Sequence, residues 1–489
     1  MSDLILHKKN EAFIQFECDR NIAQELSDYF TFYVPGYQFV PAYKSRLWDG
    51  KIRLADLRSF SIYHGLVPYI EKFCKERDYT LEIDSDVSTT ENYSAIEAAE
   101  FVKSLNLPHE IRDYQLKSFV QAIRNKRMLL LSPTASGKSL VLYCIIRYLQ
   151  IENGRGLLIV PTTSLVEQMY KDFEDYGYDS DQYCHRQYSG KDKHTNKFLT
   201  ITTWQSIYKN PGEYFEQFDF VLGDEAHQFK AKSLTTILSG CTNAKYRIGT
   251  TGTLDDSKVN KLVLEGLFGP VFKVISTKEL IERKQLANFS IKCIVLKYPE
   301  IVCKAIKGFT YPDEMNFLTQ HEGRNNFICD LAINLKGNSL ILFTYVEKHG
   351  KILYESIKER CGNRKVFFIH GGVEAEDREA VRHITEQEND AIIVASYGTF
   401  STGVNIRNLH NIVFSSPTKS KIRSLQSIGR VLRLGENKDA ATLYDIADDS
   451  STKTRRNYTL NHFIERIKIY NEENFNYEII TIQLKKNGN

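Results

Sequence analysis

The chain has 489 residues, 42% of them hydrophobic, and its 64 Lys and Arg against 61 Asp and Glu leave a formal net charge of only +3, so overall charge does not explain binding to a polyanion. No apolar run approaches the ~20 residues of a membrane-spanning helix, the first residues lack the pattern of a signal peptide, and the nine cysteines contain no Cys-x-x-Cys pair. We therefore expect a cytoplasmic protein of about three domains, without membrane contact, zinc ribbon or disulfide framework.

Residues 1–105 are expected to form a small α+β accessory domain. Within it, Asp49-Gly50 is a favoured two-residue turn, which predicts a hairpin between residues 45–48 and 51–54. The hairpin would pair Trp48 with Lys51, Leu47 with Ile52 and Arg46 with Arg53. Leu47 and Ile52 would then face the core, and the other four would share the opposite face. Opposed arginines repel unless an anion lies between them, so this face is a candidate phosphate contact; a solvated basic strand with Trp48 covering the core is the alternative.

A phosphate-binding loop is predicted at residues 132–139. The apolar run 128–131 precedes it, and the helical apolar spacing of 140–146 follows. In a strand, loop and helix of this kind, main-chain N–H groups and the helix N-terminus bind phosphates, the lysine reaches the β and γ phosphates, and the final hydroxyl binds Mg²⁺. These last two roles fall to Lys138 and Ser139. All eight residues are candidate ATP contacts: Ser132, Pro133, Thr134, Ala135, Ser136, Gly137, Lys138 and Ser139.

Two acidic residues follow the apolar run 218–223, in the sequence Asp224-Glu225-Ala226-His227. Carboxylates at the end of a buried strand need a cation. Asp224 would hold Mg²⁺, and Glu225 would orient or deprotonate the attacking water, a role typically worth ~10²–10⁴ in rate. An acidic helix cap is the structural alternative.

Apolar strand runs alternate with helical stretches in two series, which predicts two parallel sheets. The first series contains residues 128–131, 156–160, 198–203, 218–222 and 246–250. The second contains residues 339–343, 365–369, 391–395, 411–415 and 441–446. We therefore expect two RecA-like domains, residues 106–257 and 339–450. Residues 258–338, punctuated by Gly269-Pro270, are expected to be a linker with a small helical elaboration.

The second domain ends with an arginine pair, Arg430 and Arg433, about one helical turn apart. Their expected target is the γ-phosphate, because an arginine supplied by a second domain contributes ~10³–10⁵ in rate and links hydrolysis to domain motion. The tail, residues 451–489, is expected to pack back on this domain through apolar helix positions: Phe463, Ile464, Ile467 and Ile469. Whether its basic residues continue a nucleic-acid track stays open: Lys453, Arg455, Arg456, Arg466, Lys468, Lys485 and Lys486.

From residue 111 to residue 448 the chain resembles superfamily 2 helicases. The motifs that carry the resemblance are Ile111–Gln115, Val160–Thr163, Thr202–Ser206, Thr251–Thr253, Ile341–Tyr345, His370–Gly372 and Ser401–Ile406. The resemblance implies that Gln115 faces adenine and that His227 and Gln426 also line the nucleotide site. It further implies nucleic-acid contacts at Pro161, Thr162, Thr203, Thr344, Thr402 and Gly403. Gly252 and Asn405 depart from the usual pattern and leave the coupling of ATP to strand movement open.

By this resemblance the protein is an ATP-dependent DNA helicase that uses ATP and Mg²⁺. From the basic face of the expected hairpin, we expect residues 1–105 to contact the DNA backbone. More narrowly, the whole chain resembles phage helicases that remodel branched DNA in recombination-dependent replication and unwind RNA–DNA hybrids. The motor motifs alone leave three alternatives: a double-stranded DNA translocase that does not separate strands, an RNA helicase, and a non-catalytic ATP-gated clamp. Protein partners are not predicted.

Overall fold

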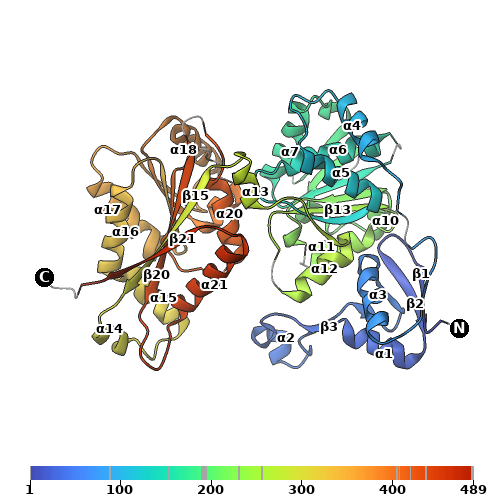
Figure 1. Ribbon diagram of the computed structural model, residues 1–489, viewed down its shortest axis with the longest axis horizontal. Coiled ribbons are helices and arrows are strands. Elements are labelled where there is room, and N and C mark those ends of the chain that lie inside the picture. Colours follow the sequence, from blue (N-terminus) through green and yellow to red (C-terminus); the bar gives the residue numbers. More distant parts are fainter. Residues whose placement is uncertain are drawn as a thin grey trace. The chain divides into compact units, whose positions relative to one another are not determined.

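The structure is a computed structural model that describes residues 2–87, 90–151, 154–188, 195–229, 232–254, 257–403, 406, 408–418, 420–435 and 438–485. It consists of two compact units. Unit 1 comprises Met1–Ser132 and Ser136–Ile275, and unit 2 comprises Ser276–Asn489 together with Pro133–Ala135. Unit 1 therefore holds an N-terminal α+β region and the first parallel sheet, and unit 2 holds the second parallel sheet (Figure 1).

The N-terminal region contains a five-stranded mixed sheet in the order β5-β6-β2-β1-β7 and a two-stranded sheet, β3-β4. Its elements are β1 Leu4–Lys8, β2 Phe13–Cys18, α1 Arg20–Tyr29, β3 Thr31–Tyr33, η1 Tyr37–Phe39, α2 Pro41–Lys44, β4 Lys51–Arg53, β5 Ala55–Asp56, β6 Ser61–Tyr63, η2 His64–Leu66, α3 Val67–Glu76, β7 Leu81–Ile83 and α4 Ala95–Ser104. α1 and α3 bury one apolar face each, with residues such as Leu26 and Phe73 fully inside the core.

The expected hairpin between residues 45–48 and 51–54 is wrong. β4 pairs antiparallel with β3, so that Ile52 lies opposite Phe32, and residues 45–48 follow the short helix α2 as a turn. Pro41 occupies the first helical position, where its fixed φ favours a helix over a strand. Leu47, expected in the core, is 84% exposed, and Gly50 lies at a bend with φ 80° rather than in the expected hairpin turn.

The first parallel sheet has seven strands in the order β10-β11-β9-β12-β13-β8-β14. Its elements are α5 Asp113–Asn125, β8 Arg127–Leu131, α6 Lys138–Gln150, β9 Gly156–Val160, α7 Thr163–Asp175, α8 Ser180–Tyr183, β10 Cys184–Gln187, β11 Leu199–Thr203, α9 Trp204–Ile207, α10 Gly212–Glu216, β12 Phe220–Gly223, η3 Ala226–Gln228, α11 Lys232–Gly240, β13 Tyr246–Thr251, α12 Lys258–Phe268 and β14 Val271–Lys273. Helices α5, α6 and α7 cover one face, and α11 and α12 cover the other (Figure 1). All five strands expected here are present.

The N-terminal region packs on the first sheet through α12. Its core and one face of the sheet form a single apolar cluster. Tyr69 donates a hydrogen bond of 2.5 Å to Glu265 of α12, and Arg127 of β8 pairs with Glu11 at 2.9 Å. A Cβ atom on Gly65 would lie 2.0 Å from the Glu265 carbonyl oxygen, so the close approach at this seam requires glycine.

The second parallel sheet also has seven strands, in the order β17-β18-β16-β19-β20-β15-β21. Its elements are α13 Thr277–Glu282, β15 Asn288–Lys297, α14 Glu300–Ala305, α15 Tyr311–Gln320, α16 Glu322–Asn334, β16 Ser339–Phe343, η4 Val346–Gly350, α17 Lys351–Arg360, β17 Val366–Ile369, α18 Ala375–Gln387, β18 Ile392–Ser396, α19 Tyr397–Gly403, β19 Asn411–Phe414, α20 Lys421–Val431, β20 Ala440–Asp449, α21 Tyr458–Glu472 and β21 Tyr477–Gln483. Helices α16 and α17 lie along one face, and α20 and α21 along the other (Figure 1).

The two sheets have the same strand order, position by position, so β8, β12 and β13 of the first correspond to β15, β19 and β20 of the second. This correspondence places residues 258–338 differently from the expected linker. β14 completes the first sheet, and β15 lies between β20 and β21 in the second. The segment is therefore divided between two packed domains. The sequence did not predict this division, because its mixed polar and aromatic residues give no sign of strand pairing with residues far along the chain.

The C-terminal tail packs on the second sheet. Helix α21 buries Phe463 and Ile469, as expected, and β21 adds an edge strand. Arg466, considered for a nucleic-acid track, is only 1% exposed and pairs with Asp445, so it belongs to the core. Lys486 lies outside the described residues. In the part of the chain that the structure describes, the helices are too short or too polar to cross a membrane.

Candidate functional site

The carboxyl edge of the first sheet is divided between two kinds of motif. The phosphate-binding loop follows β8, and the acidic motif follows β12. The segments expected to grip a nucleic-acid strand follow β9 and β11. Since ligands bind at the carboxyl ends of strands in open parallel sheets, this topology places both kinds of motif on the edge where binding occurs.

The phosphate-binding loop is held by short-range contacts. The Ser132 and Ser136 hydroxyls lie 2.5 Å apart, and the Ser132 main-chain N–H donates to the Thr251 carbonyl at 2.8 Å. Gly137 has φ 81° and Ala135 has φ 65°, a left-handed conformation that costs a residue with a Cβ atom. Lys138 begins α6, and its Nζ donates to the Ser132 carbonyl at 3.3 Å. The loop thus presents Lys138 and the N-terminus of α6 together.

Gln115 contacts the loop itself. Its Oε1 accepts a hydrogen bond from the Arg112 N–H at 2.9 Å, and its Nε2 donates to the Ser136 carbonyl at 2.9 Å. A Cβ atom on Gly137 would lie 2.2 Å from this Nε2, so the glycine allows the contact. Gln115 is only 4% exposed. The structure therefore gives it a role in supporting the loop that the sequence did not predict.

Asp224 is buried beside Lys138 and Glu225. Its Oδ1 accepts a hydrogen bond of 2.6 Å from Thr250, at the end of the neighbouring strand β13. Burial raises the pKa of the Asp224 carboxyl above its ordinary value and the Glu225 charge adds to the rise, while Lys138 and the Thr250 hydrogen bond lower it. A buried carboxylate next to a second carboxylate favours a bound cation. Thr250 was not predicted from the sequence, because it precedes the Thr251–Thr253 motif by one residue.

Glu225 and His227 continue the acidic motif. Glu225 has φ 50°, an uncommon left-handed conformation for a residue other than glycine, and its Oε2 lies 3.3 Å from Nδ1 of His227. His227 is buried, and its Nδ1 also lies 3.1 Å from the Thr251 hydroxyl. The histidine therefore connects the expected catalytic glutamate to the end of β13, and strained backbone at such a position is typical of functional sites.

The oxygen donors fit magnesium. Ser139 and Asp224 supply a hydroxyl and a carboxylate, the ligand types that Mg²⁺ prefers, and Mg²⁺ usually takes only one or two protein ligands besides phosphates and waters. Within the described residues, no cluster of three or more His, Cys, Asp and Glu side chains suits a metal. Ser139 Oγ lies 3.3 Å from the Tyr176 hydroxyl, a second partner that the sequence did not predict.

In unit 2, the arginine pair lies at the end of α20. The Arg430 guanidinium lies over the Phe400 ring of α19, 5.7 Å from the ring centroid. Arg433 lies two residues beyond the end of the helix. The expectation that both arginines lie on one regular helical turn is therefore wrong. Buried Lys438 donates to the carbonyls of Val431 and Arg433, which caps this helix end. Gln426 lies on the same helix and is half-buried.

The expected strand-gripping residues lie at equivalent places in the two sheets. In unit 1, Pro161 and Thr162 follow β9, and buried Thr203 ends β11. In unit 2, exposed Thr344 follows β16, the counterpart of β9, and the segment with Thr402 and Gly403 is in α19 after β18, the counterpart of β11. Part of the last motif, Val404 and Asn405, lies outside the described residues.

The four candidate DNA contacts of the expected hairpin lie in a small lobe, residues 31–53, which we call the aromatic lobe. They are Arg46, Trp48, Lys51 and Arg53. The rings of the lobe pack on one another: Tyr33 stacks on Tyr37 at 4.7 Å, and Lys51 Nζ lies 5.1 Å from the Tyr33 centroid. Trp48 Nε1 donates to the Lys51 carbonyl at 2.9 Å. Arg46 is exposed with φ 59°, and Arg53 pairs with Asp49 at 2.5 Å rather than opposing Arg46. Phe39, 78% exposed, and Leu47 lie on the lobe's surface.

Comparison with known proteins follows the same division of the chain. Residues 3–84 match the family "DNA helicase UvsW, N-terminal", residues 108–256 match "Type III restriction enzyme, res subunit", and residues 323–435 match "Helicase conserved C-terminal domain". The ATP-dependent DNA helicase uvsW of Enterobacteria phage T4 is 36% identical, over 99% of this chain and 100% of that protein.

A solved structure and a second protein are also similar to this chain. The crystal structure of T4 UvsW is similar with a TM-score of 0.53 and 34% identity, over 99% of this chain and 100% of that one. The DNA 3'-5' translocase XPB2 of Sulfurisphaera tokodaii is 24% identical, over 66% of this chain and 79% of that protein.

Proposed function

This chain belongs to the UvsW family of ATP-dependent DNA helicases, and we propose that it uses ATP and Mg²⁺ to translocate on DNA and to remodel branched replication and recombination intermediates. The observation that carries the proposal is the grouping of Lys138, Asp224 and Glu225 at the carboxyl edge of the first sheet, with Asp224 buried and hydrogen-bonded by Thr250. The full-length similarity to UvsW supports DNA as the nucleic acid.

In the proposed reaction, the loop N–H groups and Lys138 bind the phosphates, and Glu225 orients the attacking water. Ser139 and Asp224 would hold Mg²⁺, which would supply positive charge beside the phosphates. Arg430 and Arg433 supply the positive charge that stabilises the transferring phosphoryl group, and Arg433 is the preferred finger. Because these arginines are in the other unit, hydrolysis requires the two units to close on one nucleotide.

Strand-gripping motifs on both sheets turn this closure into movement. Each closure changes the spacing between the segments after β9 and β11 and those after β16 and β18, so alternating grip advances the protein along a phosphate backbone. The aromatic lobe is the proposed contact with the branch. It offers Arg46, Lys51 and Arg53 for phosphates, and exposed Phe39 and half-buried Trp48 for stacking on unpaired bases.

ATP turnover on different nucleic acids tests the proposal. Turnover and strand displacement would be measured side by side with single strands, blunt duplex, forks, four-way junctions and RNA–DNA hybrids. We expect forks and junctions to stimulate turnover most and to be unwound. Equal stimulation by blunt duplex without strand separation would favour a translocase, and stimulation by RNA alone would favour an RNA helicase.

A lysine pair supplies the matched control. Lys138→Ala is expected to abolish turnover while DNA binding persists. Lys245→Ala, at an exposed lysine before β13 on the opposite edge of the same sheet, should leave turnover unchanged. DNA-stimulated turnover at the full rate in Lys138→Ala would contradict the assignment of the ATP site, and a wild type without turnover would favour an ATP-gated clamp.

A further inference from the structure

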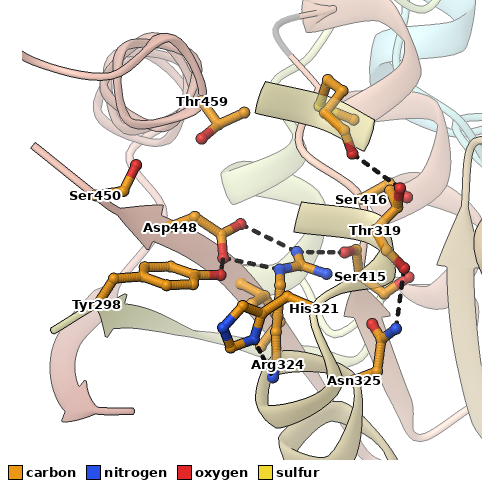
Figure 2. A network of polar contacts seen from close by, with 12 residues as sticks. Tyr298, Thr319, His321, Arg324, Asn325, Ser415, Ser416, Asp448, Ser450 and Thr459 are labelled. Carbon is orange, nitrogen blue, oxygen red and sulfur yellow. Dashed lines mark hydrogen bonds and ion pairs between the residues drawn. The ribbon is translucent and has the colours of Figure 1, made fainter. Parts of the chain in front are cut away.

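A fully buried arginine in unit 2 bridges a carboxylate and the chain that leads to α20. Arg324, on α16, donates from Nε and Nη2 to the two carboxylate oxygens of Asp448 at 2.8 and 3.0 Å, and Nη2 also donates to the Ser415 carbonyl at 2.7 Å. The Tyr298 hydroxyl donates to the same carboxylate at 2.9 Å (Figure 2). We call Arg324, Asp448 and Tyr298 the Arg324 triplet.

The same arrangement occurs a second time. Arg466, on α21, donates to both carboxylate oxygens of Asp445, at 2.7 and 2.9 Å, and its Nη1 donates to the Thr418 carbonyl at 2.6 Å. The Tyr470 hydroxyl donates to this carboxylate at 2.8 Å. We call Arg466, Asp445 and Tyr470 the Arg466 triplet. Asp445 and Asp448 are three residues apart on β20, so the two triplets lie on opposite faces of the sheet.

Both triplets end on one short segment, residues 415–418, between β19 and α20, which we call the α20 connection. The Arg324 guanidinium donates to the carbonyl of the connection's first residue, Ser415, and the Arg466 guanidinium donates to the carbonyl of its last residue, Thr418. Between them, the Ser416 hydroxyl accepts from the Thr344 main-chain N–H at 3.1 Å, and the Ser416 carbonyl accepts from the Tyr397 hydroxyl at 3.2 Å. Thr344 and Tyr397 belong to the segments after β16 and β18. The connection therefore links the two strand-gripping segments of unit 2 to the arginine helix.

Stability alone does not account for these triplets. A buried ion pair loses hydration that its attraction barely recovers, and apolar residues of similar volume are often as stable or more so. What a bidentate, fully buried guanidinium adds is a fixed direction for its remaining N–H groups. Here Nη2 of Arg324 and Nη1 of Arg466 are each directed at a main-chain carbonyl of the same connection, from opposite faces of the sheet.

We propose that the Arg324 and Arg466 triplets are positioning residues for ATP hydrolysis, which fix the α20 connection so that Arg430 and Arg433 are aligned and remain linked to the DNA-gripping segments through Ser416. This inference rests on the proposed function, because it assumes that these arginines act on the nucleotide. Loss of a triplet misaligns α20 without removing any group that touches ATP. Misplacement by ~1 Å costs up to ~10² in rate, so turnover falls while ATP binding persists.

The test replaces one triplet by apolar residues of similar shape, with the changes Asp445→Leu, Arg466→Met and Tyr470→Phe. We expect a folded protein with an ATP KM within about threefold of wild type and a DNA-stimulated kcat lower by ~10–100-fold. Glu465→Gln, at an exposed residue of the same helix α21, is the matched control and should keep kcat within about twofold. A merely structural role would instead lower the melting temperature and the number of nucleotide-binding sites, with kcat per site unchanged.

Two single variants test the inference if the triple variant does not fold. Arg324→Lys and Arg466→Lys keep the buried charge but lack the rigid fork that reaches both the carboxylate and the carbonyl. Each is expected to lower kcat while ATP KM changes little. Wild-type kcat in the folded triple variant, or in both folded lysine variants, overturns the inference.

Arg433→Ala separates this inference from the proposed function. If Arg433→Ala hydrolyses ATP at the wild-type rate, the assignment of the finger fails whatever the triplet variants do. If Arg433→Ala loses turnover and the folded triplet variants do not, the finger stands and the positioning role fails.

Discussion

The two parallel sheets have the same strand order, but different groups are fixed at the carboxyl end of the central strand. In the first sheet the fixed group is a carboxylate, and in the second it is a main-chain segment. After β12, Asp224 is fixed by Thr250 of the adjacent β13. After β19, the counterpart of β12, the α20 connection is fixed through Asp445 and Asp448 of the adjacent β20. In both sheets the neighbouring strand on the same side supplies the support.

The same fold therefore meets two different structural requirements in the two sheets. A single hydroxyl is enough to orient a carboxylate that a cation will neutralise. A connection that must aim a helix needs support at both ends, and the second sheet supplies it from helices on its two faces, α16 and α21. In the proposed reaction, the first sheet thus supplies Lys138, Asp224 and Glu225, and the second sheet aligns Arg430 and Arg433.

Arg433→Ala tests whether the second sheet supplies an arginine finger. If the second sheet supplies a finger, kcat should fall by ~10³–10⁵ with little change in ATP affinity, because the charge acts on the transition state. Steady-state turnover with saturating forked DNA measures it. The matched control is Arg360→Ala, at an exposed arginine of α17. A loss below tenfold would remove the finger from the account.

Glu225→Gln tests the corresponding role of the first sheet. We expect kcat to fall by ~10²–10⁴, since the amide keeps the shape of the side chain but is not a base. ATP binding, followed by fluorescence of a labelled nucleotide, should persist. Glu174→Gln, at an exposed residue of α7, should hydrolyse normally. Equal kcat in the two variants would contradict the role of Glu225.

Thr250→Val tests the support that Asp224 receives from β13. A hydrogen bond to a charged group is worth ~1.5–3 kcal/mol, so turnover near neutral pH should fall by about tenfold or more. The Thr250 hydrogen bond lowers the pKa of Asp224, so its loss raises that pKa. The acidic limb of the pH–rate profile should therefore move to higher pH. Thr236→Val, at an exposed threonine of α11, should leave the profile in place, and an unmoved profile in Thr250→Val would refute the proposed support.

The smallest expected effect concerns the aromatic lobe. Arg46→Glu with Lys51→Glu should weaken fork binding several-fold and lower the salt slope by about one for each phosphate that the protein no longer neutralises. Binding titrations over a range of salt concentrations measure both quantities. Lys72→Glu with Lys75→Glu, at two exposed lysines of α3, makes the same change in net charge and is the control. Unchanged affinity and slope would exclude the lobe from the DNA path.

The sequence predicted the parts of the molecule that depend on neighbours along the chain. Ten expected strands and the phosphate-binding loop are present because apolar runs and glycine at a left-handed position act locally. β15 and β21 were missed because their partners are distant in the sequence. The hairpin at Asp49-Gly50 was wrong because a proline-initiated helix competes with the first strand.

Buried charge was the hardest feature to predict. Arg324 and Arg466 are at most 1% exposed, although arginine is ordinarily a surface residue. Their partners on β20 are 124 and 21 residues away, and only the sheet brings them together. Thr250 likewise reaches Asp224 only through the pairing of β12 and β13.

If one nucleotide engages groups of both units, nucleotide binding must change the distance between the units, and that distance can be measured. Spin labels at Lys171→Cys in unit 1 and Glu359→Cys in unit 2, with the partly exposed Cys18 changed to Ser, would report the separation by pulsed electron resonance. We predict that a non-hydrolysable ATP analogue with Mg²⁺ and forked DNA shortens and narrows the distance distribution, and that Arg433→Ala weakens this change. The same distribution with and without the analogue in the wild-type protein would contradict the account.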